Sequence, residues 1–336
     1  MVVAGADNAV TDVSGIRVGH ATRIGAGALT GTTTLLLPPG CVTSVQVRGG
    51  GPCTRETAAL APDHDSPEVD AIVLTGGSVY GLSAAHGVLT WLAEQGRTDR
   101  LPLVPAAGLF DLGRGGDFHA RPDPELGRAA AAAATAGPVA QGNVGAGTGA
   151  VNAELKGGLG TASAVLPDGT VLAAIVAVNA AGGSVDQETG RPYGWRAALP
   201  GEFPQLAPGV TNRIAAENRP AEGGPHPLNT VIGVIATDAR LTPAQTYELA
   251  GAAHDGLGLA VRPAHTMADG DTIFSVATGS RADPDVDALR AATVDVFTRA
   301  MLHGVFAAES VTTPWGELTA YRDRYPPVTT SPDPVG

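Results

Sequence analysis

Glycine is the residue type that most restricts the folds open to this chain. Of its 336 residues, 46 are glycine, nearly twice the average share of about 7%. Glycine favours tight turns and close approach of two backbones, and it weakens the interior of a helix. We therefore expect short strands and helices joined by turns, rather than a bundle of long helices. With 43% hydrophobic residues, a chain of this length can bury a sizeable core.

Alternation of apolar runs with turn residues predicts a mixture of strands and helices. The predicted strands are residues 16–20, 32–37, 42–48, 70–75, 101–105, 157–167, 169–179, 230–237 and 271–277, and the predicted helices are 79–94, 122–135, 242–257 and 284–306. Asp168 and Gly169 predict the turn of a hairpin. Thr242 begins a capping-box pattern, and Asp283 is the predicted N-cap of the last helix.

Two segments lack any clear periodicity. Seven prolines punctuate residues 182–229, which predicts a long surface excursion or linker. The proline-rich tail after Tyr325 is predicted to fray.

Charge and composition exclude several classes of partner. The 33 acidic and 21 basic residues give a net charge of −12 without a basic stripe, so nucleic acids and anionic membranes are poor partners. The longest apolar run, residues 171–178, is shorter than the roughly 20 residues that span a bilayer. The N-terminus also lacks the pattern of a secretory signal. We expect a cytoplasmic protein.

Cofactor and metal sites find little support in the sequence. Cys41 and Cys53 are too few for a four-cysteine zinc site or a disulfide framework. The histidines do not have metal-ligand spacing, and His254 and His265 are interpreted as packing or surface residues. Residues 145–150 match G-x-G-x-x-G/A, but a preceding strand and a following helix are not predicted there. We therefore expect neither a metal nor a cofactor.

Ser78 is the first candidate nucleophile. It lies between a predicted strand and a predicted helix, as in the nucleophile elbow of α/β-hydrolases, but Tyr80 stands where that motif needs its last glycine. Gly76 and Gly77 either permit tight packing or offer N–H groups to an anion. The structural and the oxyanion interpretations both remain open.

Lys156 is the only lysine among the 21 basic residues. The other 20 are arginine, so the lysine indicates a need for a compact ammonium group whose pKa shifts readily on burial. The alternative is a surface lysine that has survived by chance.

The Asn229–Thr230 bond lies where the proline-rich stretch gives way to a predicted strand. A cut there would give Thr230 a free α-amine, whose pKa near 8 suits a general base beside the hydroxyl. Most Asn-Thr pairs are inert, so the spacing alone is a weak signal. Asp269 and Asp271 flank one glycine, which predicts either a simple turn or a carboxylate pair that orients a nucleophile.

Seven short motifs together resemble one family of self-processing N-terminal-nucleophile hydrolases. That family includes L-aminopeptidase/D-esterase, β-peptidyl aminopeptidase and the 6-aminohexanoate oligomer (nylon oligomer) hydrolase. The motifs are TDVSGIRVGH at 11–20, VRGGGPCTRE at 47–56, LTGGSVYG at 74–81, GNVGAG at 142–147, VNA at 178–180, NT at 229–230 and DGDT at 269–272. The resemblance extends from residue 10 to about residue 325.

The resemblance implies a fold of the α/β class, an αββα sandwich in which two packed sheets lie between helical layers. It implies a single hydrolase domain, residues 1–336, that cleaves itself into an α chain, 1–229, and a β chain, 230–336. It also implies a homo-oligomer, a tetramer or larger, of these αβ units.

Site roles also follow from the resemblance. Thr230 matches the nucleophile, released by a cut after Asn229, and Asn179 matches a residue that stabilises the oxyanion. Lys156 matches a lysine of the nylon hydrolase site, while Asp269 and Asp271 match residues that contact the nucleophile. Phe110 stands where the nylon hydrolase has a tyrosine, so a hydrogen bond is lost there and the substrate preference is expected to differ.

The implied activity is hydrolysis of short peptides or small amides, of the aminopeptidase type and without a cofactor. One alternative is an endo-acting nylon-oligomer hydrolase or a D-esterase. A second is an acyltransferase of the ornithine-acetyltransferase type, although the motif set of that enzyme is missing here. A third is a non-enzymatic scaffold that retains the motifs.

Overall fold

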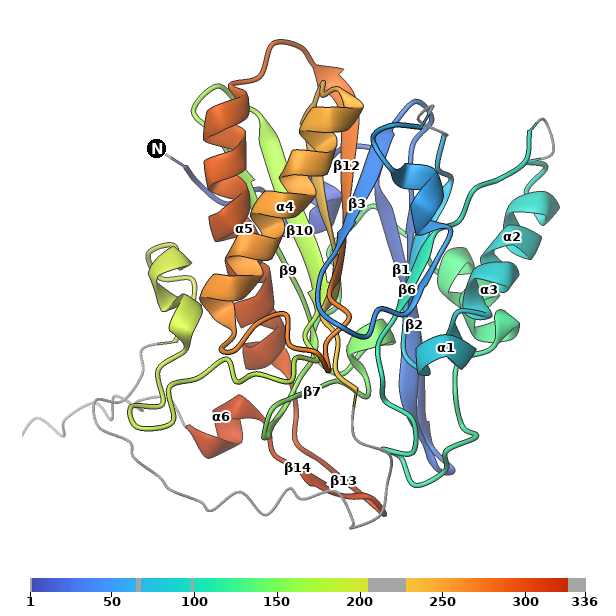
Figure 1. Cartoon of the computed structure of the whole chain (residues 1–336), viewed down its shortest axis with the longest axis vertical. Coiled ribbons are helices and arrows are strands. Elements are labelled where there is room, and N and C mark those ends of the chain that lie inside the picture. Colours follow the sequence, from blue (N-terminus) through green and yellow to red (C-terminus); the bar gives the residue numbers. More distant parts are fainter. Residues whose placement is uncertain (1, 65–67, 98–99, 205–227, 326–336) are drawn as a thin grey trace, which may run out of the picture.

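The computed structural model describes residues 2–64, 68–97, 100–204 and 228–325. Two five-stranded sheets face each other, and helices cover their outer faces (Figure 1). The first sheet has the order β1 (Arg17–Gly25), β2 (Ala28–Leu36), β5 (Ala71–Thr75), β6 (Ala106–Gly108) and β4 (Thr54–Arg55). The second has the order β3 (Val42–Val47), β12 (Thr272–Arg281), β11 (Ile232–Ala239), β10 (Val171–Ala177) and β9 (Leu159–Val165). The predicted αββα sandwich is confirmed.

One pair of helices packs on each sheet. Helices α2 (Ala84–Glu94) and α3 (Pro124–Ala132) lie on the first sheet, and α4 (Pro243–Ala260) and α5 (Val286–Ala307) lie on the second (Figure 1). The smaller elements are η1 (Val10–Asp12), η2 (Thr57–Leu60), α1 (Ser78–Gly81), η3 (Gly145–Gly147), β7 (Val151–Asn152), β8 (Leu155–Lys156), η4 (Tyr193–Ala197), β13 (Val311–Thr313), β14 (Gly316–Leu318) and α6 (Tyr321–Arg324).

The apolar runs form strands because both faces of each sheet are covered. Between the sheets, Ile72 and Leu74 belong to the same buried cluster as Ile175, Val234 and Phe274. Such two-sided burial selects continuous apolar strands over alternating ones. Burying these side chains, at about 25 cal/mol per Å² of apolar surface, is the main force that holds the two sheets together.

Glycine permits the close contact of α5 with β9. A Cβ atom on Gly160 would lie 2.1 Å from the main-chain oxygen of Ala300 and 2.1 Å from the main-chain nitrogen of Gly304. A side chain at this position would push the helix off the sheet. The high glycine content thus supports close packing of layers, as the sequence indicates.

Strand β11 lies inside its sheet, between β12, to which it is parallel, and β10, to which it is antiparallel. Strands β9, β10 and β3 precede the Asn229–Thr230 bond in the chain, whereas β11 and β12 follow it. Strands β11 and β12, which follow the bond in the chain, therefore lie between β10 and β3, which precede it.

Several predicted boundaries differ from those observed. The predicted helix 79–94 is divided into α1 and α2, and the predicted strand 101–105 gives way to β6 at Ala106–Gly108. Asp283 does not cap α5, because it has a positive φ of 51° and lies in the turn before the helix. Asp285 is the cap, and its side chain accepts from the N–H of Ala288. Helix α3 begins later than predicted because Asp123 caps it, and it ends at Ala132, before the predicted residue 135.

Two local predictions are confirmed. Thr242 and Gln245 form the capping box of α4. Strands β9 and β10 form the hairpin predicted from Asp168 and Gly169, with Gly169 at a φ of 85°, where glycine is favoured.

The predicted surface excursion at 182–229 is wrong for its first part. Residues 205–227, like the tail at 326–336, lie outside the described residues. Before them, Gly183 pairs with Arg262 in an isolated bridge, Val185 is buried, and η4 packs on α5. Proline here interrupts regular structure without keeping the segment off the core, because the half-buried rings of Trp195 and Phe203 pack against Phe306 of α5.

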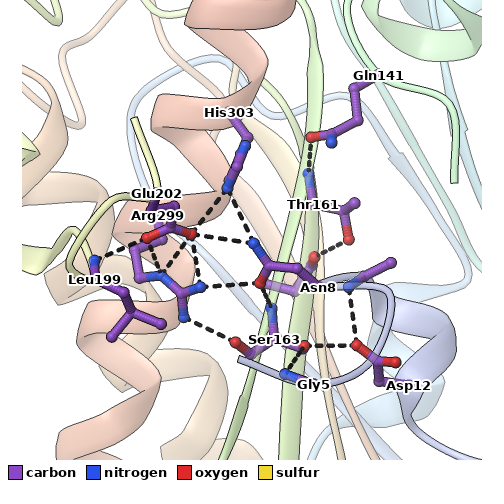
Figure 2. Close-up of polar contacts among 12 residues, drawn as sticks. Gly5, Asn8, Asp12, Gln141, Thr161, Ser163, Leu199, Glu202, Arg299 and His303 are labelled. Atoms are coloured by element: carbon purple, nitrogen blue, oxygen red, sulfur yellow. Dashed lines mark hydrogen bonds and ion pairs between the residues drawn. The ribbon is translucent and has the colours of Figure 1, made fainter. Parts of the chain in front are cut away.

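A buried polar network fastens this segment to α5 (Figure 2). The guanidinium of Arg299, whose side chain is 1% exposed, donates to both carboxylate oxygens of Glu202, to the main-chain oxygen of Ser163 and to Oδ1 of Asn8. His303 and Nδ2 of Asn8 add hydrogen bonds to the same carboxylate. Burial alone would raise the pKa of Glu202, but these bonds hold it well below its usual range. The network joins residues before and after position 229.

Within the described ranges, no helix is long and apolar enough to cross a membrane.

Candidate active site

The Asn229–Thr230 bond lies at the entrance to β11 and is buried, with Asn229 7% and Thr230 3% exposed. The N–H of Asn229 donates to the main-chain oxygen of Ala268 at 3.0 Å, and the N–H of Thr230 donates to the main-chain oxygen of Asn179 at 2.8 Å. The peptide bond is thus held on one side by the segment before β12 and on the other by the segment after β10.

The hydroxyl of Thr230 has two partners. It donates to the carbonyl oxygen of Asn229, the residue before it, and it accepts a hydrogen bond from the N–H of Gly270 at 3.2 Å. The oxygen therefore lies against the carbonyl group that it would attack in self-cleavage. The N–H donor from Gly270 favours negative charge on this oxygen.

Asp269 fixes the loop around the hydroxyl, but in the described part of the chain its carboxylate makes no hydrogen bond with that hydroxyl. Its Oδ1 accepts from the N–H of Ala181 at 3.0 Å, and its Oδ2 accepts from both the N–H and the hydroxyl of Thr266, at 2.9 Å and 2.6 Å. The carboxylate thereby joins the segment after β10 to the turn that presents Gly270.

Asp271 lies on the other side of Gly270. Its Oδ1 accepts from the N–H of Val231 at 2.7 Å, and its Oδ2 lies 2.7 Å from Nδ1 of His265. Burial raises the pKa of Asp271, while the hydrogen bond from His265 opposes that rise. The expected contact with Thr230 is indirect, because Asp271 holds the next residue along the chain.

His265 is a residue that sequence reasoning did not assign to the site. Its separation of six residues from Asp271 is uninformative by itself, because the loop between them could turn in many ways. The histidine takes a positive φ of 55°, and its ring packs edge-on against His254. Only the folded loop brings its ring to the carboxylate.

The side-chain oxygen of Asn179 accepts two hydrogen bonds, whereas its amide nitrogen donates none among the described residues. Its Oδ1 accepts from Nη1 of Arg114 at 2.6 Å and from the N–H of Val151 at 2.9 Å. Its Nδ2 is buried and has no hydrogen-bond partner in the part of the chain that the structure describes. An unpartnered buried donor beside Thr230 suits the stabilisation of an oxyanion.

Lys156 is fully buried on β8, so the interpretation as a surface lysine is wrong. Its ammonium donates to the main-chain oxygens of Gly157 at 2.5 Å and of Gly147 at 3.1 Å. Burial first, and the charge of Arg114 second, lower the pKa of Lys156 to about 7, against an opposing effect of Asp111. The described residues give no hydrogen bond between this ammonium and Thr230.

Asp111 and Arg114 complete a buried charged cluster that the sequence did not reveal. Oδ1 of Asp111 accepts from the N–H of Gly77 at 2.7 Å, and burial raises its pKa to about 6. Burial also lowers the pKa of Arg114 to about 10, although Asp111 opposes this. Asp111 directly follows Phe110, which is half-buried, and Arg114 lies three residues after Asp111. The only available signal was two opposite charges in an otherwise apolar and glycine-rich stretch.

The main-chain donors at residues 76–78 are already in use. The N–H of Gly76 donates to Gly31 and that of Ser78 to Leu109, each at 2.9 Å, and the N–H of Gly77 donates to Asp111. In this arrangement none of the three is available to bind an oxyanion. The turn itself is sharp, because Gly77 and Ser78 both have positive φ, of 78° and 51°.

A model of one protein family, peptidase family S58, matches residues 8–319. The chain belongs to peptidase family S58. It is therefore an enzyme of a peptidase family, and the resemblance drawn from the seven motifs is confirmed.

Two groups of curated proteins are similar to this chain in sequence. An uncharacterized aminopeptidase of Mycobacterium tuberculosis is 45% identical over 346 residues, which cover 95% of this chain and 98% of that protein. A 6-aminohexanoate-oligomer endohydrolase of Paenarthrobacter ureafaciens is 33% identical over 74% of this chain and 69% of its own length.

A solved structure confirms the fold class of this S58 member. The L-aminopeptidase D-Ala-esterase/amidase of Ochrobactrum anthropi, described as a variant of the Ntn-hydrolase fold, superposes with a TM-score of 0.73. The match covers 96% of this chain and 93% of that chain at 24% identity. The fold is therefore that of the Ntn hydrolases.

Proposed function

We propose that this S58 peptidase cleaves its own Asn229–Thr230 bond and then uses Thr230 as the nucleophile for hydrolysis of short peptides or small amides. The observation that carries the proposal is the buried hydroxyl of Thr230, which lies against the carbonyl of Asn229 and accepts a hydrogen bond from Gly270. Nucleophile and target belong to neighbouring residues, so the attack is intramolecular and gains from proximity.

Self-cleavage then proceeds through an ester. Oγ of Thr230 attacks the carbonyl carbon of Asn229, the C–N bond breaks, and the threonine nitrogen takes up the proton as it becomes an amine. Water next hydrolyses the ester, which gives Asn229 a carboxylate and returns the hydroxyl of Thr230. The products are an α chain, 1–229, and a β chain, 230–336.

The same hydroxyl serves external substrates. The new α-amine of Thr230 has an intrinsic pKa near 8 and acts as the general base. Attack on a substrate amide gives an acyl-enzyme and releases the amine product, and water then releases the acid. Nδ2 of Asn179 donates to the oxyanion in each step, because this buried donor has no partner of its own among the described residues.

Three charged residues support the nucleophile in this proposal. Asp269 and Asp271 fix the turn that presents Gly270 to the hydroxyl. Lys156, with a pKa lowered to about 7, contributes positive charge to the buried cluster that also holds Arg114 and Asp111, and it lowers the proton affinity of the site. Gly76, Gly77 and Ser78 shape the turn against Asp111.

The proposed substrate class rests on the relatives together with two exposed apolar side chains near the Asn229–Thr230 bond. One relative is named an aminopeptidase and another an endohydrolase of 6-aminohexanoate oligomers. Leu228 and Met267, which are 43% and 84% exposed, lie beside Gly51 and Gly50 and close in sequence to Asn229 and Asp269. Exposed apolar side chains near the site suit small amides with uncharged side chains. We propose a cytoplasmic homo-oligomer, a tetramer or larger, of αβ units.

Intact mass and N-terminal sequencing test the proposed cut. The purified protein is expected to give two fragments, and the smaller one should begin at Thr230. Thr230→Ala should remain one chain without amidase activity, whereas the matched control Ser78→Ala should be cut normally. A new N-terminus elsewhere, or an active Thr230→Ala protein, would refute the assignment.

The second candidate is endo-acting hydrolysis, which the 33% identity with the 6-aminohexanoate-oligomer endohydrolase favours. Hydrolysis rates distinguish endo-acting from aminopeptidase activity. The substrates to compare are short peptides with a free amine and N-blocked amide oligomers of the same length. A preference for the blocked oligomers would assign the endo-acting class.

A further inference from the structure

We propose that Arg114 is a positioning residue that orients the amide of Asn179 toward the oxyanion. The inference rests on the proposed function, in which Nδ2 of Asn179 is the oxyanion donor. Arg114 lies in the loop after β6, far in sequence from Asn179, and neither the motifs nor the relatives' names assign it a role.

The geometry leaves one orientation for the amide group. Two donors, Nη1 of Arg114 at 2.6 Å and the N–H of Val151 at 2.9 Å, point at the same side-chain oxygen of Asn179. Rotating the amide by half a turn would place its NH₂ group against both donors. Because the group is planar and fully buried, fixing Oδ1 also fixes Nδ2.

The fixed Nδ2 is the group left without a partner. Buried polar atoms are nearly always hydrogen-bonded, so an exception needs an explanation. Asn179 also touches the nucleophile residue directly, since its main-chain oxygen accepts from the N–H of Thr230 at 2.8 Å. Asn179 is so close to Thr230 that its unpartnered Nδ2 has a functional explanation: it binds negative charge that develops only during the reaction.

Arginine suits this role better than a neutral donor. Its Nη1 also donates to the main-chain oxygen of Gly149 at 2.7 Å, and its own main-chain oxygen accepts from the hydroxyl of Thr313 at 2.7 Å, so it is anchored at both ends. The nearby carboxylate of Asp111 favours the charged guanidinium. A charged donor on Oδ1 polarises the amide and makes Nδ2 a stronger donor.

A double-mutant cycle tests whether Arg114 acts through Asn179. We expect Arg114→Met to lower kcat about 100-fold, as removal of one oxyanion donor does, with KM changed less than about twofold. Asn179→Ala should have a similar effect, and the double variant should be no slower than Asn179→Ala alone. Losses that multiply in the double variant, or a raised KM with unchanged kcat, would overturn the proposal.

Arg114→Lys keeps the test decisive if the methionine variant does not fold. Lysine retains the charge but replaces the planar fork, so kcat should fall on the order of tenfold, and this loss should also vanish in the Asn179→Ala background. Wild-type kcat in this variant, or an additive loss, would count against orientation by the guanidinium. Thermal melting should match that of the wild type.

Two further proteins separate this proposal from the proposed function. Arg281→Met is the matched control, because Arg281 lies at the far end of β12 and binds Asp168 and Asp238; its cleavage and kcat should be normal. If Thr230→Ala remains active, the proposed function itself fails. If Thr230→Ala is inactive but the Arg114 and Asn179 losses are independent, only the role of Arg114 fails.

Discussion

Nδ1 of His265 lies 2.7 Å from Oδ2 of Asp271, whose other oxygen accepts from the main chain at Val231. This hydrogen bond favours the ionised carboxylate and opposes the rise in the pKa of Asp271 that burial causes. The imidazole therefore helps to keep a buried carboxylate charged next to the proposed nucleophile.

Replacing His265 should move the acid limb of the pH–rate profile. His265→Phe keeps a ring against His254 but removes the hydrogen bond, so the pKa of Asp271 should rise and its carboxylate should be protonated at higher pH. Measured kcat against pH should fall off earlier on acidification than in the wild type. His86→Ala, on the exposed side of α2, is the control. An unshifted acid limb would show that the pair does not tune the site.

Lys156→Arg should be far more damaging than a swap of like charges suggests. The ammonium is fully buried and donates to the carbonyls of Gly147 and Gly157, so we expect the larger, planar guanidinium to crowd its neighbours. We expect slower self-cleavage and a loss of turnover of about 100-fold, or about 2.7 kcal/mol of barrier. The kinetics of Lys156→Arg and Lys156→Met check this. Near-normal turnover in the arginine variant would mean that only positive charge matters.

Stability should depend on pH through the same lysine. The pKa of Lys156 is lowered to about 7 in the folded protein, against about 10.4 in an unfolded chain. Between these values the unfolded chain binds more protons, so the free energy of unfolding contributed by this group rises as the pH rises from 7 toward 10. Urea unfolding of Thr230→Ala, with and without Lys156→Met, should show this rise only when the lysine is present. Parallel curves would contradict a neutralised lysine.

The network around Arg299 should contribute strongly to stability. Glu202→Gln or Arg299→Met leaves the other partner buried without its counter-charge, which costs about 3–5 kcal/mol. Denaturant unfolding in the uncleaved Thr230→Ala background measures this. The control is Arg290→Met, because the side chains of Arg290 and Glu248 are 47% and 53% exposed, and such pairs contribute below about 1 kcal/mol. Equal effects at the two sites would refute a special role for the buried pair.

The fold could largely be predicted because it depends on patterns that are local in sequence. The capping box at Thr242 and the hairpin turn at Gly169 are set by a few neighbouring residues. The predicted start of the last helix was wrong because a single backbone angle decides it: Asp283 has a positive φ and is not the N-cap. Residues 182–204 were misjudged because prolines signal irregular backbone, whereas burial depends on distant partners such as Arg299.

The candidate site was only partly predictable for a related reason. Thr230, Asn179 and the acidic pair belong to short motifs that a reader of the sequence can recognise. Arg114 and His265 belong to no such motif, and their importance comes from side chains that meet only after folding. Lys156 could be singled out because it is the only lysine in the sequence. Its partners are two main-chain carbonyls, which no sequence pattern predicts.

The placement of β11 and β12 between β10 and β3 has a consequence for the lifetime of the enzyme. The uncut polypeptide carries all five strands and can refold alone after a transient unfolding. After the proposed cut, two polypeptides would contribute strands to the same sheet, and refolding would require them to associate in solution. The proposed activation would then be irreversible for each molecule. A cleaved enzyme would persist for as long as its unfolding is slow, so its stability would be set by the rate of unfolding rather than by an equilibrium.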